Sequence, residues 1–483
     1  MAGTYKQRDF RAGIEDQSLI NELTTRKIVV REPVRLSPGW ESTDKPDDEL
    51  NFRSVTMDQV DLELNPPKDK LNIVFLIMVL HGIGTLMPWN MFITARNYFE
   101  NYKFSSNYTV ENTTYASNYV NSVSFSAQIP NVIFNWINLF MPLGGDLTTR
   151  IVWGILVQVL IFVETVVLAM LDTSTWPGVF FWITMISVVV LNTFNGIYQN
   201  SVYGMAAKLP GKYTGAVVLG SNISGTFTAL VDLLALKMAP SLRTAAIYYF
   251  LTALFVLLAC FDTYFALPIN RFYRYHEMIF QKDKQKKELE TKSKIHGRTP
   301  YWTIFKQASP QLFNIFFVFF VTLSLFPAVQ SSIKASDENF IVSEKYYMSV
   351  MCFVTFNVTA MIGSLLASHV QWPKKECLVL PVVLRVLFIP LFLVCNYVPA
   401  KEFTRTMPVL ITNDWVYFAI AVLMGVSSGY LSSLGMMYCP STVDSRYAST
   451  AGMFGAAFLI TGIFTGVLTA IVMPYIVSMR VWE

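Results

Sequence analysis

The sequence predicts an all-α polytopic membrane protein with eleven transmembrane helices in a 6+5 arrangement. Hydrophobic residues make up 53% of the 483 positions and charged residues only 14%, and the mean hydropathy is +0.42. A soluble domain has too little interior to cover that much apolar side chain. In addition, apolar stretches near the ~20 residues that cross hydrocarbon recur from Leu71 to the end of the chain. Both observations predict a protein that folds within a bilayer.

Each predicted span is an apolar stretch bounded by polar or turn-forming residues. The stretches lie near residues 71–95, 123–143, 151–171, 177–206, 213–238, 244–268, 311–331, 344–370, 377–398, 414–438 and 449–478.

The spacing of the stretches divides the chain into four parts. Residues 1–68 are polar and carry charges of both signs, which predicts a cytosolic disordered tail. Residues 69–268 hold six stretches and residues 311–483 hold five, so we expect an N-terminal six-helix bundle and a C-terminal five-helix bundle. The basic residues 269–310 between them predict a cytosolic linker. Two such bundles can rock about a central cavity.

The distribution of basic residues predicts the orientation, because short cytosolic loops collect Lys and Arg. With the N-terminus in the cytosol, the first outer loop carries the sequons Asn107-Tyr-Thr and Asn112-Thr-Thr, which makes both asparagines candidate glycosylation sites. An odd number of spans places the C-terminus outside. The basic residues of the predicted inner loops include Arg150, Lys208, Lys212, Lys374, Lys375 and Arg446.

Several classes of protein are not supported by the sequence. The five cysteines fall within or beside apolar stretches, which argues against a disulfide framework or a metal site. The net charge of +4 is small for this length and gives no reason to expect a nucleic acid partner. The zinc-enzyme motif HExxH is absent from the sequence. We therefore expect no cofactor, no metal and no enzymatic activity.

The predicted spans contain many neutral polar side chains. Such groups are costly in hydrocarbon, so they tend to face a water-filled path or a partner helix. Neutral amides suit an uncharged, hydrogen-bonding solute, and Trp89, Phe326 and Phe353 can stack against a flat ring. The alternative is that the amides only join helices to one another. The amides of the first, second and fourth stretches are Asn90, Gln128, Asn131, Asn135, Asn192, Asn195, Gln199 and Asn200.

Two ionisable side chains within the spans are candidates for proton coupling. Glu164 lies in the third stretch and His81 in the first, and their side chains can exchange protons. Either side chain can instead be a satisfied partner of a neighbouring helix.

Five sequence motifs resemble those of the equilibrative nucleoside transporters, a family of animal solute carriers. They are GIGTLMPWNMFITA, NGIYQNSVYGMAAKLPGKYT, FNVTAMIG, SSGYLSSL and STAG, and the resemblance extends from about residue 70 to residue 478. It implies a major-facilitator-like fold with a central cavity. It also implies facilitative transport of nucleosides or nucleobases by alternating access.

The resemblance also implies roles for individual residues. Gln199 would form a hydrogen bond with the nucleobase, and Arg150 would help to close the inner gate. The residues that would line the cavity are Leu86, Trp89, Asn90, Ile93, Gln128, Asn131, Phe326, Phe353, Asn357 and Ile463.

The eighth stretch departs from the family pattern. Where the family reads FNxxDWxGR, with Asp and Arg at the ribose side of the ligand, this chain has Ala360 and Ser364. We expect weaker ribose recognition, which leaves a low-affinity nucleoside carrier or a carrier that prefers nucleobases. The resemblance implies that the cation-accepting branch of the family has an acidic residue early in its fifth span. This chain has Ser221 at that position, so organic cations are disfavoured as substrates. The alternatives are a non-transporting sensor or scaffold and a facilitator for another small polar or cationic solute.

The N-terminal tail contains a candidate sorting signal. The segment Glu15-Asp-Gln-Ser-Leu19-Ile20 resembles an acidic dileucine signal, which would bind sorting adaptors and route the protein to endosomes or lysosomes. Short patterns of this kind are common in polar tails, so we favour the plasma membrane. The expected partners are thus the lipid bilayer, a nucleoside or nucleobase, and such adaptors.

Overall fold

The computed structural model describes residues 66–110, 115–141, 145–238, 241–291, 299–337, 340–399 and 403–479. The chain divides into two units, Met1–Val60 and Asp61–Glu483, and everything described here belongs to the second. The sorting residues Glu15, Leu19 and Ile20, and the second sequon at Asn112, lie outside the described residues.

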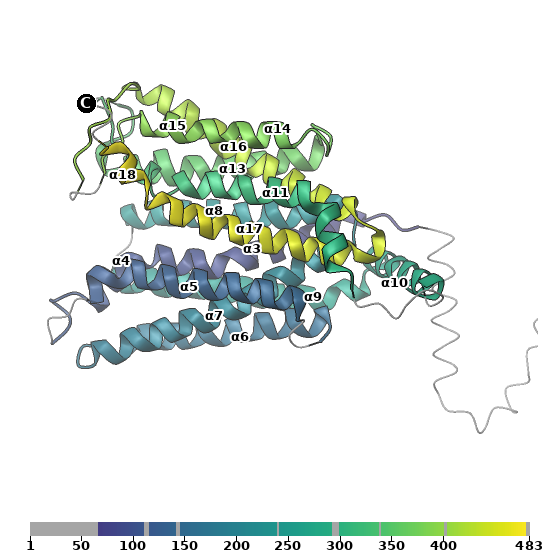
Figure 1. Cartoon of the computed structure of the whole chain (residues 1–483). Helices are drawn as coiled ribbons and strands as arrows, with labels where there is room; N and C mark the ends of the chain where they lie inside the picture. Colours follow the sequence, from purple (N-terminus) through teal and green to yellow (C-terminus); the bar gives the residue numbers. More distant parts are fainter. Residues whose placement is uncertain are drawn as a thin grey trace, which may run out of the picture. The chain divides into compact units, whose positions relative to one another are not determined.

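The described chain is almost entirely helical (Figure 1). In its first half, the long helices overlap the first six predicted spans, and α5 begins at Tyr115, earlier than the predicted start at 123. They are α3 (Ile73–Thr94), α5 (Tyr115–Phe140), α6 (Leu147–Met170), α7 (Pro177–Ala206), α8 (Gly211–Met238) and α9 (Leu242–Ala266). The second half follows after α10 (Arg271–Thr291). It contains α11 (Tyr301–Leu325), α12 (Glu344–Tyr347), a π-helical segment at Met348–Val354, α13 (Thr355–His369), α14 (Val379–Leu384), α15 (Phe388–Leu393), α16 (Asp414–Tyr438), α17 (Ala448–Ala470) and α18 (Met473–Val477).

The seventh span starts earlier than expected. Its helix, α11, begins at Tyr301 rather than near residue 311, because residues 301–310 continue the helix and Pro310 is accommodated inside it. The helix ends at Leu325, where Phe326 takes an extended conformation. A residue that precedes a proline is pushed out of the α region, and Pro327 follows Phe326.

Nine helical segments of the described chain are long and apolar enough to cross a membrane. The two remaining predicted spans, 123–143 and 377–398, differ for separate reasons. The first forms α5, which is 26 residues long but rich in amides and serines. The second is broken into α14, a short 3₁₀ turn and α15, and it contains Pro381 and Pro390, each of which lacks an N–H to donate. The count of eleven spans therefore stays a prediction.

The two halves of the described chain meet along two groups of helices. Within the first half, α3 packs on α8 and α9, while α7 packs on α5 and α6. Within the second half, α11 packs on α17, and α13 on α16. Contacts between the halves join α8 to α13 and α16, and join α5 and α7 to α17 (Figure 1).

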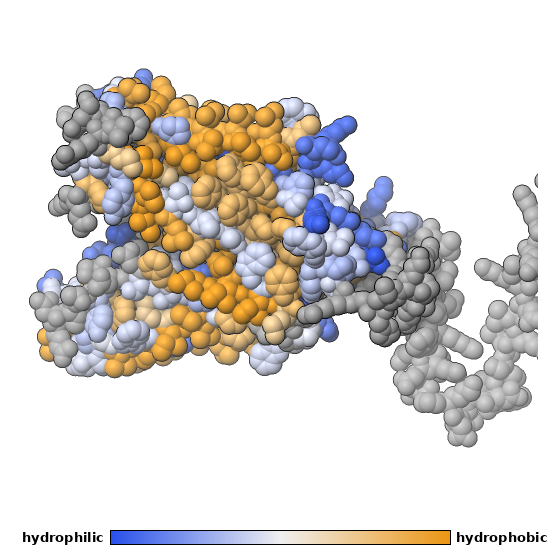
Figure 2. Space-filling model, viewed as in Figure 1, coloured by the Kyte–Doolittle hydropathy of each residue, from blue (hydrophilic) through white to orange (hydrophobic). Residues whose placement is uncertain are grey.

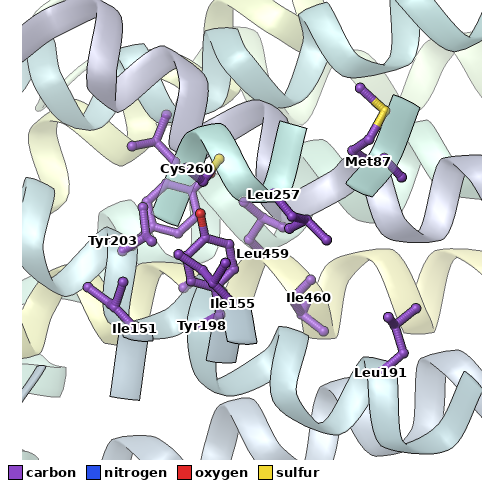
Figure 3. Close-up of a cluster of buried hydrophobic side chains, with 14 of the residues drawn as sticks. Met87, Ile151, Ile155, Leu191, Tyr198, Tyr203, Leu257, Cys260, Leu459 and Ile460 are labelled. Atoms are coloured by element: carbon purple, nitrogen blue, oxygen red, sulfur yellow. The ribbon is translucent and has the colours of Figure 1, made fainter. Parts of the chain in front are cut away.

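A shared hydrophobic core joins the halves (Figure 3). Tyr198 of α7 points its hydroxyl toward Cys260 of α9, and both side chains are fully buried. Leu459 and Ile460 of α17, from the second half, complete the same cluster. The contact between α17 and the first half therefore excludes solvent and resembles the interior of a single domain.

The outer surface of the helices is apolar (Figure 2). Large side chains such as Trp153, Trp182, Phe255 and Leu423 are mostly exposed. Exposed apolar area on this scale marks a surface that another apolar phase covers. Together with the long apolar helices, it defines a multi-pass membrane protein.

Helix α10, in the predicted linker, contacts loops of both halves. Lys208, between α7 and α8, forms an ion pair with Glu277 at 2.9 Å and lies over the ring of Phe280. Ser445, between α16 and α17, donates a hydrogen bond to Asp283 at 3.1 Å. These contacts place the α7–α8 and α16–α17 loops at one end of the helices, called here the α10 end.

Candidate functional site

Along the C-terminal half of α3, one strip of half-buried residues lies among buried ones. Leu86, Trp89, Asn90 and Ile93 are half-buried, while Met87, Pro88, Met91 and Phe92 around them are buried. The spacing of i, i+3, i+4 and i+7 places the four residues on one face. The cavity-lining residues that were predicted on this helix therefore share a face.

The neighbouring α8 presents a polar turn to α3. The Ser221 hydroxyl donates to the backbone carbonyl of Gly82 at 3.2 Å. One turn further along, Asn90 donates from Nδ2 to the Ser224 hydroxyl at 3.1 Å. Asn90 is thus held by α8 and remains half-buried, so part of its carboxamide stays accessible.

The amides of α5 and α7 are more deeply placed than those of α3. Gln199 is 3% exposed, and its side-chain oxygen lacks a hydrogen-bond partner among the described residues. Asn131 is buried and accepts a hydrogen bond from Asn135 at 3.0 Å, whereas Gln128 is half-buried. A buried acceptor without a partner costs free energy on the order of 1–3 kcal/mol, and the cost is recovered when a donor reaches it. Gln199 is therefore prepared to accept a hydrogen bond.

The aromatic residues predicted in the second half lie together. The rings of Phe326 and Phe356 stack with centroids 4.0 Å apart, and Phe353 meets Phe326 edge-on at 5.8 Å. Phe326 packs against a core cluster of the second half, whereas Trp89, on α3 of the first half, packs against the shared core. The predicted stacking residues thus belong to opposite halves.

Asn357 and Ile463 extend the set in the second half. Asn357, on α13, is half-buried, and its side-chain oxygen lies so close to Gly225 of α8 that a Cβ there would collide with it. Ile463 is half-buried on α17 and packs against the hydrophobic core that both halves share. Both residues therefore lie where the two halves meet.

The two departures from the family pattern are buried. Ala360 is 1% exposed and Ser364 is fully buried. A Cβ at Gly429 of α16 would collide with the carbonyl of Ala360, so the backbones of α13 and α16 are in direct contact there. The Ser364 hydroxyl donates to the carbonyl of Gly429 at 3.1 Å. Small residues at both positions therefore fit a close crossing of two helices.

Arg150 begins a chain of hydrogen bonds that links the halves at the α10 end. Its Nη1 donates to Asn138 of α5 at 3.2 Å, and Asn138 donates to Asn200 of α7 at 2.9 Å. Asn200 in turn donates to the backbone carbonyl of Met453 in α17 at 2.9 Å. All three polar side chains are buried. Asn138 was missed by the sequence analysis, although an amide in a predicted span is itself a signal.

The two candidates for proton coupling have different surroundings. His81 is fully buried, and its Nδ1 lies 2.8 Å from the hydroxyl of Tyr198. Glu164 is half-buried and accepts a hydrogen bond from the Ser187 hydroxyl at 3.2 Å. Both side chains have partners on a neighbouring helix. The interpretation as interhelical partners accounts for these contacts without a proton path.

A buried arginine in the second half was not identified from the sequence. Arg385, between α14 and α15, is 2% exposed and donates from Nη2 to Thr322 of α11 at 2.8 Å. It also donates from Nη1 to the Ser427 hydroxyl and to the Met424 carbonyl of α16. The sequence did carry a signal for it, because Arg385 lies inside the apolar stretch 377–398. Burial of a cation in such a stretch costs free energy unless the cation has polar partners, so partners could have been expected. Arg385 joins three spans behind α13.

The described sequon lies in a loop that other contacts order. Asn107 is exposed. Its neighbour Tyr108 donates from its hydroxyl to Asp172 at 2.8 Å, which fastens this loop to the turn between α6 and α7. Hydrogen bonds from the Ser174 backbone N–H and the Tyr108 hydroxyl lower the pKa of Asp172.

Comparison with known proteins identifies the family. The family model described as "Nucleoside transporter" matches residues 185–475. Equilibrative nucleoside transporters 1 and 2 of Homo sapiens are each 30% identical over 83% of this chain and 96% of their own length. Equilibrative nucleotide transporter 1 of Arabidopsis thaliana is 27% identical over 84% of this chain and 86% of its own. A solved structure, the human organic anion transporter MFSD10 (TETRAN), aligns with a TM-score of 0.48 and 11% identity over 86% of this chain and 97% of its own.

The apolar helices and their amide-bearing faces, taken with these matches, define a multi-pass membrane transporter. The chain belongs to the nucleoside transporter family. Membership confirms the predicted resemblance and facilitative transport as the class of function. It also agrees with the expectation that the chain is not an enzyme, since the family consists of transporters.

The hydrogen bonds of Asn200 predict an effect on stability. Asn200→Ala removes the bonds to Asn138 and to the Met453 carbonyl, both buried. We expect a loss of roughly 1–3 kcal/mol in the free energy of unfolding, because buried polar groups are left unpaired. A lower melting temperature of the purified protein in detergent checks this expectation. Asn192→Ala is the matched control, since among the described residues the Asn192 amide donates to the Val188 carbonyl of its own helix. Equal shifts for both variants would contradict the role of Asn200.

Proposed function

We propose that this chain carries nucleosides or nucleobases across a membrane by facilitated diffusion. The single observation that supports it best is Gln199, whose side-chain oxygen is buried and unpaired among the described residues of a nucleoside transporter family member. A nucleobase presents N–H donors at its edge, and a buried acceptor without a partner is suited to receive one. The similar proteins are named equilibrative nucleoside transporters, which points to the same substrates.

The proposed site lies between the halves. Leu86, Trp89, Asn90 and Ile93 form one wall from α3, and Gln128 and Asn131 contribute from α5. Phe326 and Phe353 provide aromatic area on the other side, where their contact already fixes both rings. Flat rings gain from such surfaces through stacking and apolar burial. Asn357 and Ile463, which lie where the halves meet, complete the proposed wall.

Substrate preference in this proposal follows from α13. Ala360 and Ser364 place no charge at the positions that the family pattern reserves for Asp and Arg. A hydrogen bond to a charged group is about twice as strong as one between neutral groups. We therefore propose weak ribose recognition, with low affinity for nucleosides or a preference for nucleobases.

The proposed transport cycle uses the 6+5 division as two bundles. Arg150 would keep the α10 end closed through Asn138 and Asn200, and release of this chain of hydrogen bonds would open that end. The α10 end corresponds to the predicted cytosolic side, since the basic linker lies there.

Uptake measurements test this proposal. Cells that lack endogenous nucleoside uptake and express this chain should take up radiolabelled uridine, adenosine and adenine with saturation, and should not take up a monoamine. Gln199→Ala should raise the KM for adenine about three- to tenfold, the effect of losing one neutral hydrogen bond.

Asn192→Ala serves as the matched control, because its amide is bonded within α7. No saturable uptake of any of these solutes would contradict transport. Binding of labelled uridine without flux into vesicles would instead support the non-transporting sensor or scaffold.

We also propose that the first loop faces the outside and that the N- and C-termini lie in the cytosol and outside, respectively. Asn107 is exposed, as an acceptor for N-linked glycan must be. Glycosidase treatment should increase the gel mobility of the unsubstituted chain. The double variant Asn107→Gln/Asn112→Gln should migrate at the deglycosylated position with or without the enzyme. Unchanged mobility of the unsubstituted chain would argue against this orientation.

The proposed location is the plasma membrane, with endosomes or lysosomes as the alternative. Fluorescence imaging of Leu19→Ala/Ile20→Ala discriminates between them. If adaptors read the tail signal, the double variant should move from intracellular vesicles to the cell surface. If the unsubstituted chain and the double variant are both found at the cell surface to the same extent, the plasma membrane is supported as the location and the tail segment is not a sorting signal.

A further inference from the structure

A hydrogen bond between side chains is one of the contacts that join α8 to α13. Asn222 of α8 donates from Nδ2 to the Ser364 hydroxyl of α13 at 2.7 Å. Ser364 is fully buried and itself donates to the Gly429 carbonyl at 3.1 Å. Asn222 is only half-buried. The bond therefore joins the two halves of the chain, and its accessible partner is Asn222.

The position of Asn222 on α8 indicates that it faces the second half and not lipid. An exposed apolar stripe on this helix contains Phe227, Leu230 and Leu234, spaced three and four residues apart. Asn222 falls outside that stripe, because successive residues of a helix are rotated by about 100°. The adjacent position on the same side, Gly225, meets Asn357 of α13. Asn222 and Gly225 thus share the interface with α13.

The hydrogen-bonding capacity of the pair is unequal. A hydroxyl has one donor and accepts through its lone pairs, and Ser364 uses its donor on Gly429 and accepts from Asn222. A carboxamide has two N–H donors and a carbonyl acceptor, and Asn222 uses one donor on Ser364. A solute that enters between the halves therefore meets the carboxamide of Asn222, while Ser364 is withheld from it.

We propose that Asn222 is a specificity-determining residue, anchored by Ser364, that binds the hydroxyl-bearing part of an uncharged solute. This inference rests on the proposed function and refines it. The flat ring of the solute has aromatic partners at Trp89, Phe326 and Phe353, and its edge has Gln199. Sugar hydroxyls both donate and accept hydrogen bonds, and the carboxamide of Asn222 carries donors and an acceptor. The family's charged pair on α13 is thus replaced by a neutral amide on α8.

Uptake kinetics of two solutes that differ only in the sugar test this inference. Uridine carries the ribose and uracil does not. In Asn222→Ala, the KM for uridine should rise about three- to tenfold, whereas the KM for uracil should change less than about twofold. Ser364→Ala should raise the KM for uridine in the same direction, because Asn222 loses its anchor. The double variant should not exceed Asn222→Ala by more than about twofold, since both changes remove one interaction.

Thr228→Ala is the matched control on α8, because within the described part of the chain the Thr228 hydroxyl donates to the Ser224 carbonyl of its own helix. Asn222→Ser retains a hydrogen-bonding group and should give an intermediate KM for uridine, which covers the case in which Asn222→Ala fails to reach the membrane. An equal rise in both KM values, or additive effects in the double variant, would overturn the inference. If the unsubstituted chain shows no saturable uptake, the proposed function is overturned together with this inference. If uptake is normal but the ratio of the KM values for uridine and uracil is unchanged in Asn222→Ala, this inference alone is overturned.

Discussion

The close approach of α8 to its neighbours on both sides is the constraint on which the arrangement of the site depends. In lipid, helices gain little from hydrophobic burial against one another, so van der Waals contact and interhelical hydrogen bonds decide which faces meet. A Cβ at Gly82 would collide with the Val217 carbonyl, and one at Gly220 with the Val79 carbonyl. The backbones of α3 and α8 can therefore touch only because both positions are glycine. That contact fixes the position along the helix axis at which Ser221 and Ser224 meet α3. It therefore also fixes the position of Asn222 relative to α13.

The second contact between the halves uses different chemistry. Where α8 and α13 meet, the hydrogen bond from Asn222 to Ser364 and the close approach of Asn357 to Gly225 are among the contacts of the interface. Where α5 and α7 meet α17, a chain of amides from Arg150 to the Met453 carbonyl accompanies tight apolar packing. Neutral hydrogen bonds are individually worth only about 0.5–1.5 kcal/mol net. An interface of this kind can be stable in one arrangement and still separate at thermal energies, as alternating access requires.

The second half is stabilised behind the site by Arg385. Its guanidinium reaches α11 and α16 at once, and Thr322, one of its partners, also contacts Ser428 at 3.0 Å. Removal of one partner of a buried charge is costly, whereas a charge with several polar partners is tolerated. The broken span around Arg385 thus becomes a fixed support for α16, against which α13 packs. Ala360 and Ser364 lie on that packed face.

The sequence by itself determined the membrane-embedded helical fold, the positions of most spans and the family, because hydropathy and local motifs are properties of contiguous residues. It also located the amides of α3, α5 and α7, since any polar residue in an apolar stretch is conspicuous. The 3₁₀ turn at Arg385–Leu387, which lies between helices that contain Pro381 and Pro390, and the end of α11 before Pro327 are associated with local chemistry as well. Only the tertiary structure decided which side chains are paired. The bond between Asn222 and Ser364, the chain from Arg150 to Met453 and the burial of Arg385 each join residues far apart in sequence, so no local pattern encodes them. Gln199 is the intermediate case. The sequence showed an amide within a predicted span, but only the tertiary structure showed that no donor on the described neighbouring helices reaches its side-chain oxygen.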